Sequence, residues 1–126
     1  MTNAWKPLHE FLKSPEQKKR EWISVETSRY TLSTYLRKTR RYIHHRIYQT
    51  IDLASIEVFP EHQGGCSALL DILEAIETVD AVFVESVLNP QFSTYLMRRG
   101  YEHVGTKDQL DYVKFTEISK EVTSAL

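Results

Sequence analysis

Residues 58–77 read VFPEHQGGCSALLDILEAIE, and this stretch decides the fold. An apolar run ends near Val58, two glycines follow at Gly64 and Gly65, and leucine and isoleucine then recur at helical spacing. The pattern predicts a strand that passes through a glycine loop into a helix. The first N–H groups of such a helix, with the positive end of its dipole, suit phosphate oxygens. Such loops also use glycine only to turn, so both interpretations stand.

The composition predicts one globular domain that covers residues 1–126. The chain is 41 % hydrophobic and 26 % charged, and its length supplies one core. A single cysteine, Cys66, excludes an internal disulfide, and no Cys/His cluster has the spacing of a zinc site. No apolar run approaches the roughly 20 residues of a membrane span. The amino terminus lacks the apolar core of a signal peptide, so we expect a cytoplasmic protein that binds neither metal nor membrane.

The first half of the chain predicts helices and then strands. One helix is expected within residues 5–13, and a second from Pro15 to about Glu21 with Ser14 as its cap. Residues 31–59 are rich in threonine, aromatic and branched residues, which predicts two or three antiparallel strands with a turn at residues 38–41.

The second half predicts alternating elements after the glycine loop. A helix, a buried strand at residues 81–86 and a helix ending at Gly100 are followed by strands at 101–105 and 111–115. Residues 116–126 are expected to form a polar tail. Because a helix connects the strands on either side of it, those two strands should be parallel or splayed parallel within a mixed sheet.

The order and spacing of these motifs resemble the GNAT superfamily of N-acetyltransferases. That family's pyrophosphate loop reads Gln/Arg-x-x-Gly-x-Gly/Ala after a strand ending in valine, and here Gln63 and Ala68 match while Cys66 replaces a glycine. The strand AVFVES, then Asn89 and a helix ending in YLMRRGY, is similar to the family's second half. The resemblance covers residues 31–105. It implies an α/β (α+β) fold, with a mixed, mostly antiparallel sheet, a central splayed pair of parallel strands and flanking helices. No strand of the family's usual kind is expected before the first helix.

The resemblance also implies acetyl-CoA as co-substrate. The strand end at Val58 would bind the pantetheine arm, and main-chain N–H groups of the loop would bind the pyrophosphate. Asn89 would lie near CoA, or alternatively cap the helix that follows it. Cys66 either fills the glycine position as a half-buried residue, or is a reactive thiol whose pKa the helix start lowers. The implied loop residues are Gln63, Gly64, Gly65, Cys66, Ser67 and Ala68.

Catalysis in this family needs a base for the incoming ammonium and often an acid for the leaving thiolate. We favour Glu57 as the base if a bulge turns the strand end toward the cleft. Strict alternation places Asp52 on the opposite face of the same strand. Tyr95 is the candidate acid, although the family's tyrosine position holds Leu96 here. Surface or ion-pair roles for the carboxylates, and a core role for Tyr95, remain as alternatives.

The net charge of −1 hides a segregation along the chain. No acidic residue occurs at 27–51, whereas residues 47–97 hold eight carboxylates and no Lys or Arg. We therefore expect a basic end and an acidic end. The basic segment is interpreted as a solvated hairpin, as a dock for an acidic protein or the CoA 3′-phosphate, or as a nucleic-acid contact. Its cations are Arg37, Lys38, Arg40, Arg41 and Arg46.

Three hypotheses of function follow. The first is an N-acetyltransferase that moves an acetyl group from acetyl-CoA to an amine of a protein, with a small molecule or aminoacyl-tRNA as the other acceptors. The second is a GNAT-like protein without catalysis that binds a partner, which Cys66 and Leu96 favour. The third is a nucleic-acid-binding domain that uses the basic segment. A homodimer that covers an open sheet edge is a further expectation.

Overall fold

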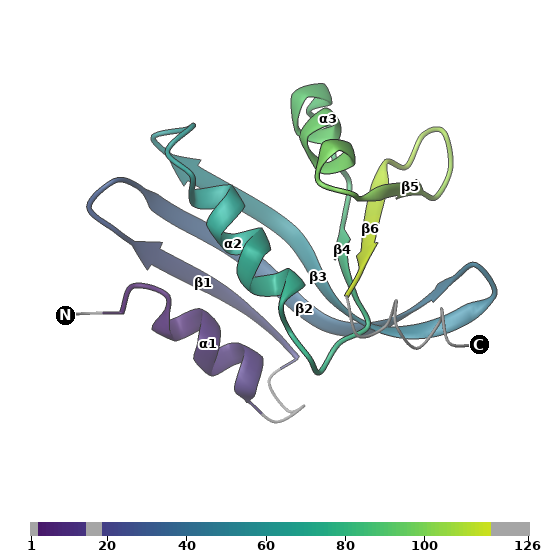
Figure 1. Ribbon diagram of the computed structural model, residues 1–126, viewed down its shortest axis with the longest axis horizontal. Coiled ribbons are helices and arrows are strands. Elements are labelled where there is room, and N and C mark those ends of the chain that lie inside the picture. Colours follow the sequence, from purple (N-terminus) through teal and green to yellow (C-terminus); the bar gives the residue numbers. More distant parts are fainter. Residues whose placement is uncertain (1–2, 15–18, 117–126) are drawn as a thin grey trace.

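The computed structural model describes residues 3–14 and 19–116. Within these ranges six strands form one sheet in the order β1-β2-β3-β4-β6-β5, antiparallel except for the parallel pair β3 and β4 (Figure 1). The predicted fold class is therefore confirmed. In chain order the elements are α1 (Lys6–Lys13), β1 (Arg20–Glu26), β2 (Thr31–Ile43), β3 (Arg46–Phe59), α2 (Gly65–Glu74), β4 (Ala81–Val84), α3 (Pro90–Arg98), β5 (Glu102–Val104) and β6 (Asp111–Phe115).

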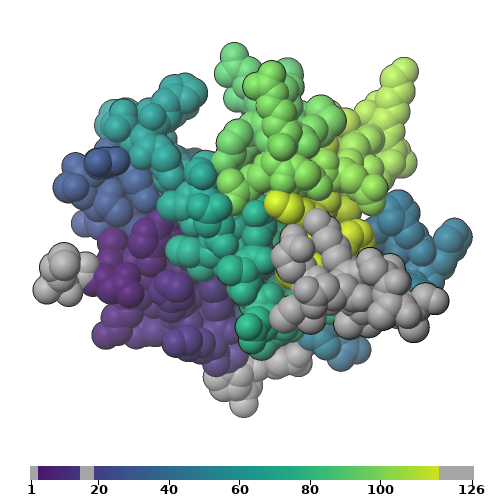
Figure 2. All heavy atoms as spheres, viewed as in Figure 1, coloured from purple at the N-terminus to yellow at the C-terminus, as the bar shows by residue number. Residues whose placement is uncertain are grey.

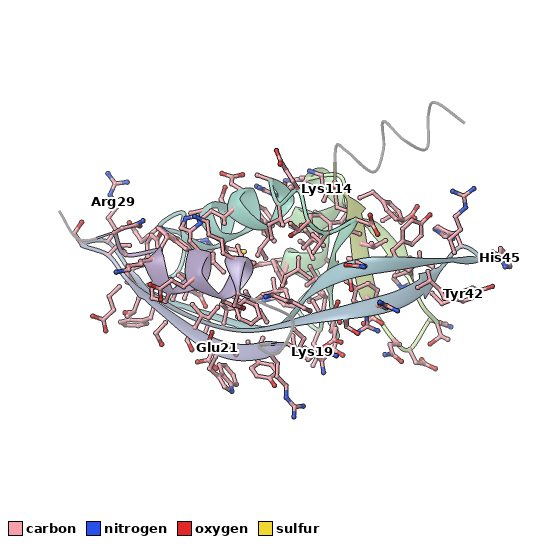
Figure 3. The ribbon with its side chains drawn as sticks, turned by 90° about the horizontal axis from the view of Figure 1, so that it is seen from below. Lys19, Glu21, Arg29, Tyr42, His45 and Lys114 are labelled. Carbon is pink, nitrogen blue, oxygen red and sulfur yellow. The ribbon has the colours of Figure 1, made fainter. Side chains whose placement is uncertain are left out.

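The three helices lie on one face of the sheet (Figures 1 and 3). The main core fills the space between them and the sheet, where α1 contributes Leu8 and α2 contributes Leu69 and Leu73, all three fully buried. A smaller apolar cluster on the opposite face contains Ile43 and Phe83, because the long β2–β3 hairpin curls beneath β4 and β6. No helix among the described residues has the length and apolarity needed to cross a bilayer.

The amino-terminal region differs from the prediction after its first helix. The helix predicted within residues 5–13 is present as α1, but Ser14 ends it, with its N–H 3.2 Å and its hydroxyl 2.7 Å from the Phe11 carbonyl oxygen. Residues 15–18 lie outside the described ranges. Arg20 and Glu21 belong to the edge strand β1, not to a second helix. The Ser-Pro-Glu-Gln motif predicted a helix. In the structure the apolar alternation of Ile23 and Val25 prevails, because it lets β1 pack against α1.

The β2–β3 hairpin is longer than predicted and turns elsewhere. Residues 38–41 continue β2, so the turn predicted there was wrong. The chain reverses at His44 and His45, which both have positive φ, 48° and 70°. Two-residue hairpin turns need such angles and usually obtain them from asparagine or glycine, so two histidines gave no signal. The ring of His44 contacts Glu102 of β5 at 2.6 Å.

The region after residue 64 follows the prediction closely. The helix, the fully buried strand β4 and the second helix occur where periodicity and caps placed them. The strand predictions at 101–105 and 111–115 are confirmed as β5 and β6. The predicted parallel pairing of the strands that flank α2 is confirmed by β3 and β4. The predicted tail lies outside the described residues except for Thr116, whose N–H donates to the Asp80 carbonyl oxygen at 2.8 Å.

Candidate functional site

The central feature of the site is a fork between β3 and β4. The two strands pair from Thr50 with Ala81 to Leu53 with Val84, and the last bond runs from Glu85 N–H to the Leu53 carbonyl oxygen at 3.1 Å. Among the described residues, β3 beyond this bond pairs only with β2, while the chain after β4 turns toward β6 through the bond from Val87 N–H to Leu110 O, 2.8 Å long. Within the described part of the chain, the fork therefore leaves one edge of β3 unpaired beyond Leu53. Figure 2 shows the corresponding notch between the loop after β3 (teal) and α3 (green).

A β-bulge sits at the apex of the fork. Tyr35 of β2 is opposite Ser55 and Leu36 is opposite Leu53, so Ala54 is an extra residue in β3. An extra residue reverses the alternation of side chains along a strand. Asp52 and Glu57 therefore share the face opposite the helices, and the prediction that they point to opposite faces was wrong. Glu57 itself is exposed, four residues beyond Leu53, where the pairing of β3 with β4 ends.

The two glycines of the loop serve different purposes. Gly64 has φ +87°, which side-chain-bearing residues rarely adopt, and the space where a Cβ would lie is open. At Gly65 a Cβ would lie 2.9 Å from Val58 Cγ1 and 3.1 Å from Tyr30, so glycine lets α2 begin directly against β3. Position 64 requires glycine because of its backbone conformation, and position 65 requires glycine because α2 packs closely against β3.

The amino end of α2 presents free donors beside this open space. Its N-cap, Gly64, supplies no side-chain hydrogen bond, and the first turn contains no acidic residue. The first helical bond runs from Ala68 N–H to the Gly64 carbonyl oxygen at 3.0 Å. Within the described residues, the N–H groups of Gly65, Cys66 and Ser67 thus have no acceptor. Gln63 is exposed just before them, and the half-buried Val58 lies beneath. This arrangement fits a pyrophosphate.

Cys66 is a half-buried residue in α2. Burial raises the pKa of the Cys66 thiol to about 11, and the positive charge of Arg99 only partly opposes this. This direction of the pKa favours the alternative of a half-buried, neutral side chain over that of a reactive cysteine with a lowered pKa.

The raised pKa of Cys66 makes stability depend on alkaline pH. An unfolded cysteine ionises near pH 8.5, so between that pH and about 11 the unfolded chain has lost a proton that the folded chain keeps. Folding stability should therefore fall as pH rises through this window. Denaturant titration should show a smaller fall for Cys66→Ser than for the parent chain. Equal falls in the two proteins would show that Cys66 is not the responsible group.

Asn89 and Tyr95 are both held by α3. The Asn89 side chain caps the helix by accepting from Gln91 N–H at 2.8 Å and from Phe92 N–H at 3.4 Å. The Tyr95 hydroxyl lies 3.4 Å from Arg99 Nη1, which is also 3.5 Å from Ser67 Oγ. Tyr95 thus faces the seam between α3 and α2, beside the first turn of α2.

A partly buried cluster of opposite charges lies at the apex of the fork, on the face away from the helices. Asp52 is fully buried and saturated: its Oδ1 accepts from Thr50 Oγ1 at 2.7 Å, and its Oδ2 accepts from Arg41 Nη2 at 2.7 Å and from Arg41 Nε at 3.0 Å. Glu85 pairs through one oxygen with both Arg37 and Arg41. Burial would lower the pKa of Arg41, but Asp52, Glu85 and Asp111 together raise it.

The sequence did not identify this cluster. The predicted basic and acidic ends instead meet here, because residues of the basic segment pair with Asp52 and Glu85. The remaining cations of that segment differ in exposure. Lys38 donates to Ser14 Oγ at 2.9 Å and lies 4.6 Å from the Phe11 ring centroid, whereas Arg40 and Arg46 are exposed. The segregation of charge along the sequence predicted a basic and an acidic region, but it did not predict that these two regions form ion pairs with each other.

Comparison with known proteins supports the fold through structure and not through sequence. No family model matches the sequence, and no curated protein matches it. A point mutant of the AtaT toxin, bound to the C-terminus of the antitoxin AtaR and acetyl-CoA, superposes with a TM-score of 0.56 at 12 % identity over 74 % of this chain and 63 % of that one. A second AtaT structure, with the AtaR C-terminus, gives 0.56 at 13 % over 72 % and 62 %. A KacTA–DNA complex gives 0.54 at 13 % over 94 % and 85 %.

These similarities establish a GNAT-like fold for this chain. The chain spans 63 % and 62 % of the two AtaT chains and 85 % of the chain in the KacTA complex.

Proposed function

We propose that the chain is an N-acetyltransferase that binds acetyl-CoA in the fork and transfers the acetyl group to an amine, on a protein in preference to a small molecule. The observation that carries the proposal is the fork itself: an unpaired edge of β3 leads to the free N–H groups of Gly65, Cys66 and Ser67. An extended pantetheine arm suits such an edge, and a pyrophosphate suits such a helix start. The acetyl-CoA bound to the AtaT mutant, a protein of the same fold, supports the proposal.

The reaction joins the amine nitrogen to the thioester carbonyl carbon, breaks the C–S bond and returns a proton to sulfur. We assign Glu57 as the group that accepts the ammonium proton through water, and Tyr95 as the group that protonates the thiolate. Asp52 is unsuited to the first role, because Thr50 and Arg41 occupy both of its oxygens. Asn89 would position CoA by holding the start of α3.

A second function is favoured by a specific observation. The apex carboxylates are already paired with arginine, Glu57 is solvent-exposed, and the Tyr95 hydroxyl lies beside Arg99. These features suit a protein that binds CoA, or a partner, without turnover.

Ligand binding is tested by thermal denaturation with acetyl-CoA, CoA and GTP. A ligand at 100 times its Kd stabilises the folded state by about 2.7 kcal/mol, so acetyl-CoA and CoA should raise Tm by several degrees and GTP should not. No rise with millimolar acetyl-CoA would rule out both the enzyme and the CoA-binding protein.

Turnover then separates the enzyme from the binding protein. Release of free thiol from acetyl-CoA is followed with candidate peptide and small-molecule amines, for the parent chain and for Glu57→Gln and Tyr95→Phe. General acid–base groups contribute typically 10²–10⁴-fold, so each variant should be slower by about 100-fold. Equal rates in parent and variants would refute the two assignments, and CoA binding without turnover would favour the second function.

A further inference from the structure

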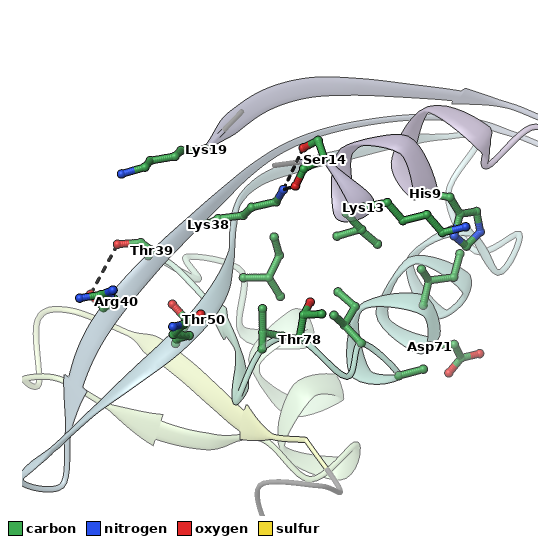
Figure 4. Close-up of a pocket in the computed structure, with 17 residues that line it drawn as sticks. His9, Lys13, Ser14, Lys19, Lys38, Thr39, Arg40, Thr50, Asp71 and Thr78 are labelled. Atoms are coloured by element: carbon green, nitrogen blue, oxygen red, sulfur yellow. Dashed lines mark hydrogen bonds between the residues drawn. The ribbon is translucent and has the colours of Figure 1, made fainter. Parts of the chain in front are cut away.

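A hollow lined by described residues lies at the other end of α2, away from the fork. It is formed where the carboxyl ends of α1 and α2 stand over β2 and β3 (Figure 4), and its volume is about 1260 Å³. None of its described lining residues belongs to the candidate CoA site. We call it the basic groove, and its lining includes His9, Leu12, Lys13, Ser14, Lys19, Lys38, Thr39, Arg40, Gln49, Thr50, Ile51, Asp71, Ile72, Ala75, Ile76, Thr78 and Val79.

The basic groove combines an aliphatic floor with cationic walls. Aliphatic side chains come from α1, β3 and α2 and the turn that follows, among them Leu12, Ile51 and Ile76. Its Lys and Arg side chains are Lys13, Lys19, Lys38 and Arg40.

The described carboxylates of the lining do not balance its three exposed cations, Lys13, Lys19 and Arg40. Asp71 is the one carboxylate among the described lining residues, and it already pairs with Arg99. Lys13, Lys19 and Arg40 are exposed to solvent. A segment that brings both carboxylates and apolar side chains would therefore find complementary partners in the groove.

We propose that the basic groove binds an acidic amphipathic segment of a partner protein. Its aliphatic floor would receive leucine-like side chains from one side of that segment. The exposed cations Lys13, Lys19 and Arg40 would pair with the carboxylates that flank them. Its volume exceeds the 300–1,000 Å³ or so of typical small-molecule pockets, which favours a polypeptide. Among the described lining residues no Phe, Tyr or Trp offers a stacking surface for bases, which disfavours single-stranded nucleic acid.

The test is fluorescence anisotropy with the full chain and a labelled twelve-residue peptide of glutamate and leucine at helical spacing. Matched probes replace its glutamates by lysine or its leucines by serine, and a fourth probe is a single-stranded oligonucleotide of twelve nucleotides. Only the glutamate–leucine peptide should bind below 100 μM, and added salt should weaken it. Lys13→Glu combined with Arg40→Glu should raise its Kd at least about tenfold. Lys107→Glu with Arg98→Glu, which reverses two exposed cations outside the groove, should leave Kd unchanged.

Several results would overturn the proposal. They are no binding at 1 mM peptide, equal binding of the serine-substituted peptide or the oligonucleotide, or equal Kd values for the groove and control variants. Displacement of the peptide by CoA would also overturn it, because the groove and the fork share no described residue. Peptide binding does not require acetyl transfer, so failure of either proposal leaves the other standing.

Discussion

Replacing Glu74 by alanine is expected to lower the free energy of unfolding by about 3 kcal/mol, the lower end of the range for breaking a buried ion pair. Glu74 of α2 accepts from Arg99 Nε at 2.6 Å, from the Tyr101 hydroxyl at 2.8 Å and from Lys114 Nζ at 3.2 Å. The side chains of Glu74, Arg99 and Lys114 are only 17 %, 16 % and 19 % exposed. Alanine would leave two poorly solvated cations and a buried hydroxyl without this acceptor.

The protonation states in this cluster support that expectation. Burial raises the pKa of Tyr101, and the charge of Glu74 and the hydrogen bond to its carboxylate raise that pKa further. The Tyr101 hydroxyl therefore stays neutral and donates. Burial would lower the pKa of Arg99, but Glu74 and Asp71 outweigh it and raise that pKa. The cluster joins α2 to the end of α3, across the seam that Tyr95 faces, and it also includes Lys114 of β6.

Chemical and thermal denaturation measure the effect of Glu74→Ala. A loss of 3 kcal/mol corresponds to a fall of roughly 10 °C in Tm for a chain of this size. Glu77→Ala is the matched control, because Glu77 is exposed and lies just beyond the same helix. A loss below 1 kcal/mol for Glu74→Ala, or equal losses for both variants, would contradict the argument.

Replacing Ser67 by aspartate is expected to weaken CoA binding about 100-fold while leaving the fold intact. Ser67 is the third residue of α2, where a carboxylate interacts favourably with the helix dipole by about 0.3–1 kcal/mol. Arg99 Nη1, 3.5 Å from Ser67 Oγ, would add a cationic partner. In the proposed complex, however, the same carboxylate would repel the pyrophosphate over a few ångströms, which costs several kcal/mol at the dielectric of a protein surface.

Asparagine at the same position separates charge from shape. Ser67→Asn adds nearly the same volume without the charge, so its Kd for CoA by isothermal titration calorimetry should stay within a few-fold of the parent value. Denaturant unfolding should show that Ser67→Asp is at least as stable as Ser67→Asn. If both variants bind CoA equally well, the pyrophosphate does not lie at the start of α2.

Most of the fold's second half could be predicted because its signals are local. Gly64 reports a backbone angle, Asn89 followed by proline reports a helix start, and Gly100 reports a helix end, each within a few residues of the feature itself. The candidate CoA site inherits this property, since most of its predicted residues occupy one loop and one helix start.

The first half shows where local patterns were insufficient. The turn at His44 and His45 lacks the residues that favour positive φ, so tertiary packing of the hairpin beneath β4 and β6 selects it. The bulge at Ala54 decides which face Glu57 occupies, and in the sequence it appears only as a change of phase between the apolar pairs Ile51/Leu53 and Ile56/Val58. Ser14 was predicted to cap a helix that begins after it, whereas in the structure this serine ends α1.

The sequence by itself therefore determined the elements that form the fork: a strand, a glycine loop, a helix and a parallel strand follow from period, glycine placement and chain connectivity. Only the tertiary structure decided which charges lie at its apex. Arg37 and Glu85 are 48 residues apart, and Arg41 lies 11 residues from Asp52. Such pairs form because sheet register brings their side chains onto one face, where a buried carboxylate needs a cation or donor. Register depends on the whole sheet, and no short stretch of sequence encodes it.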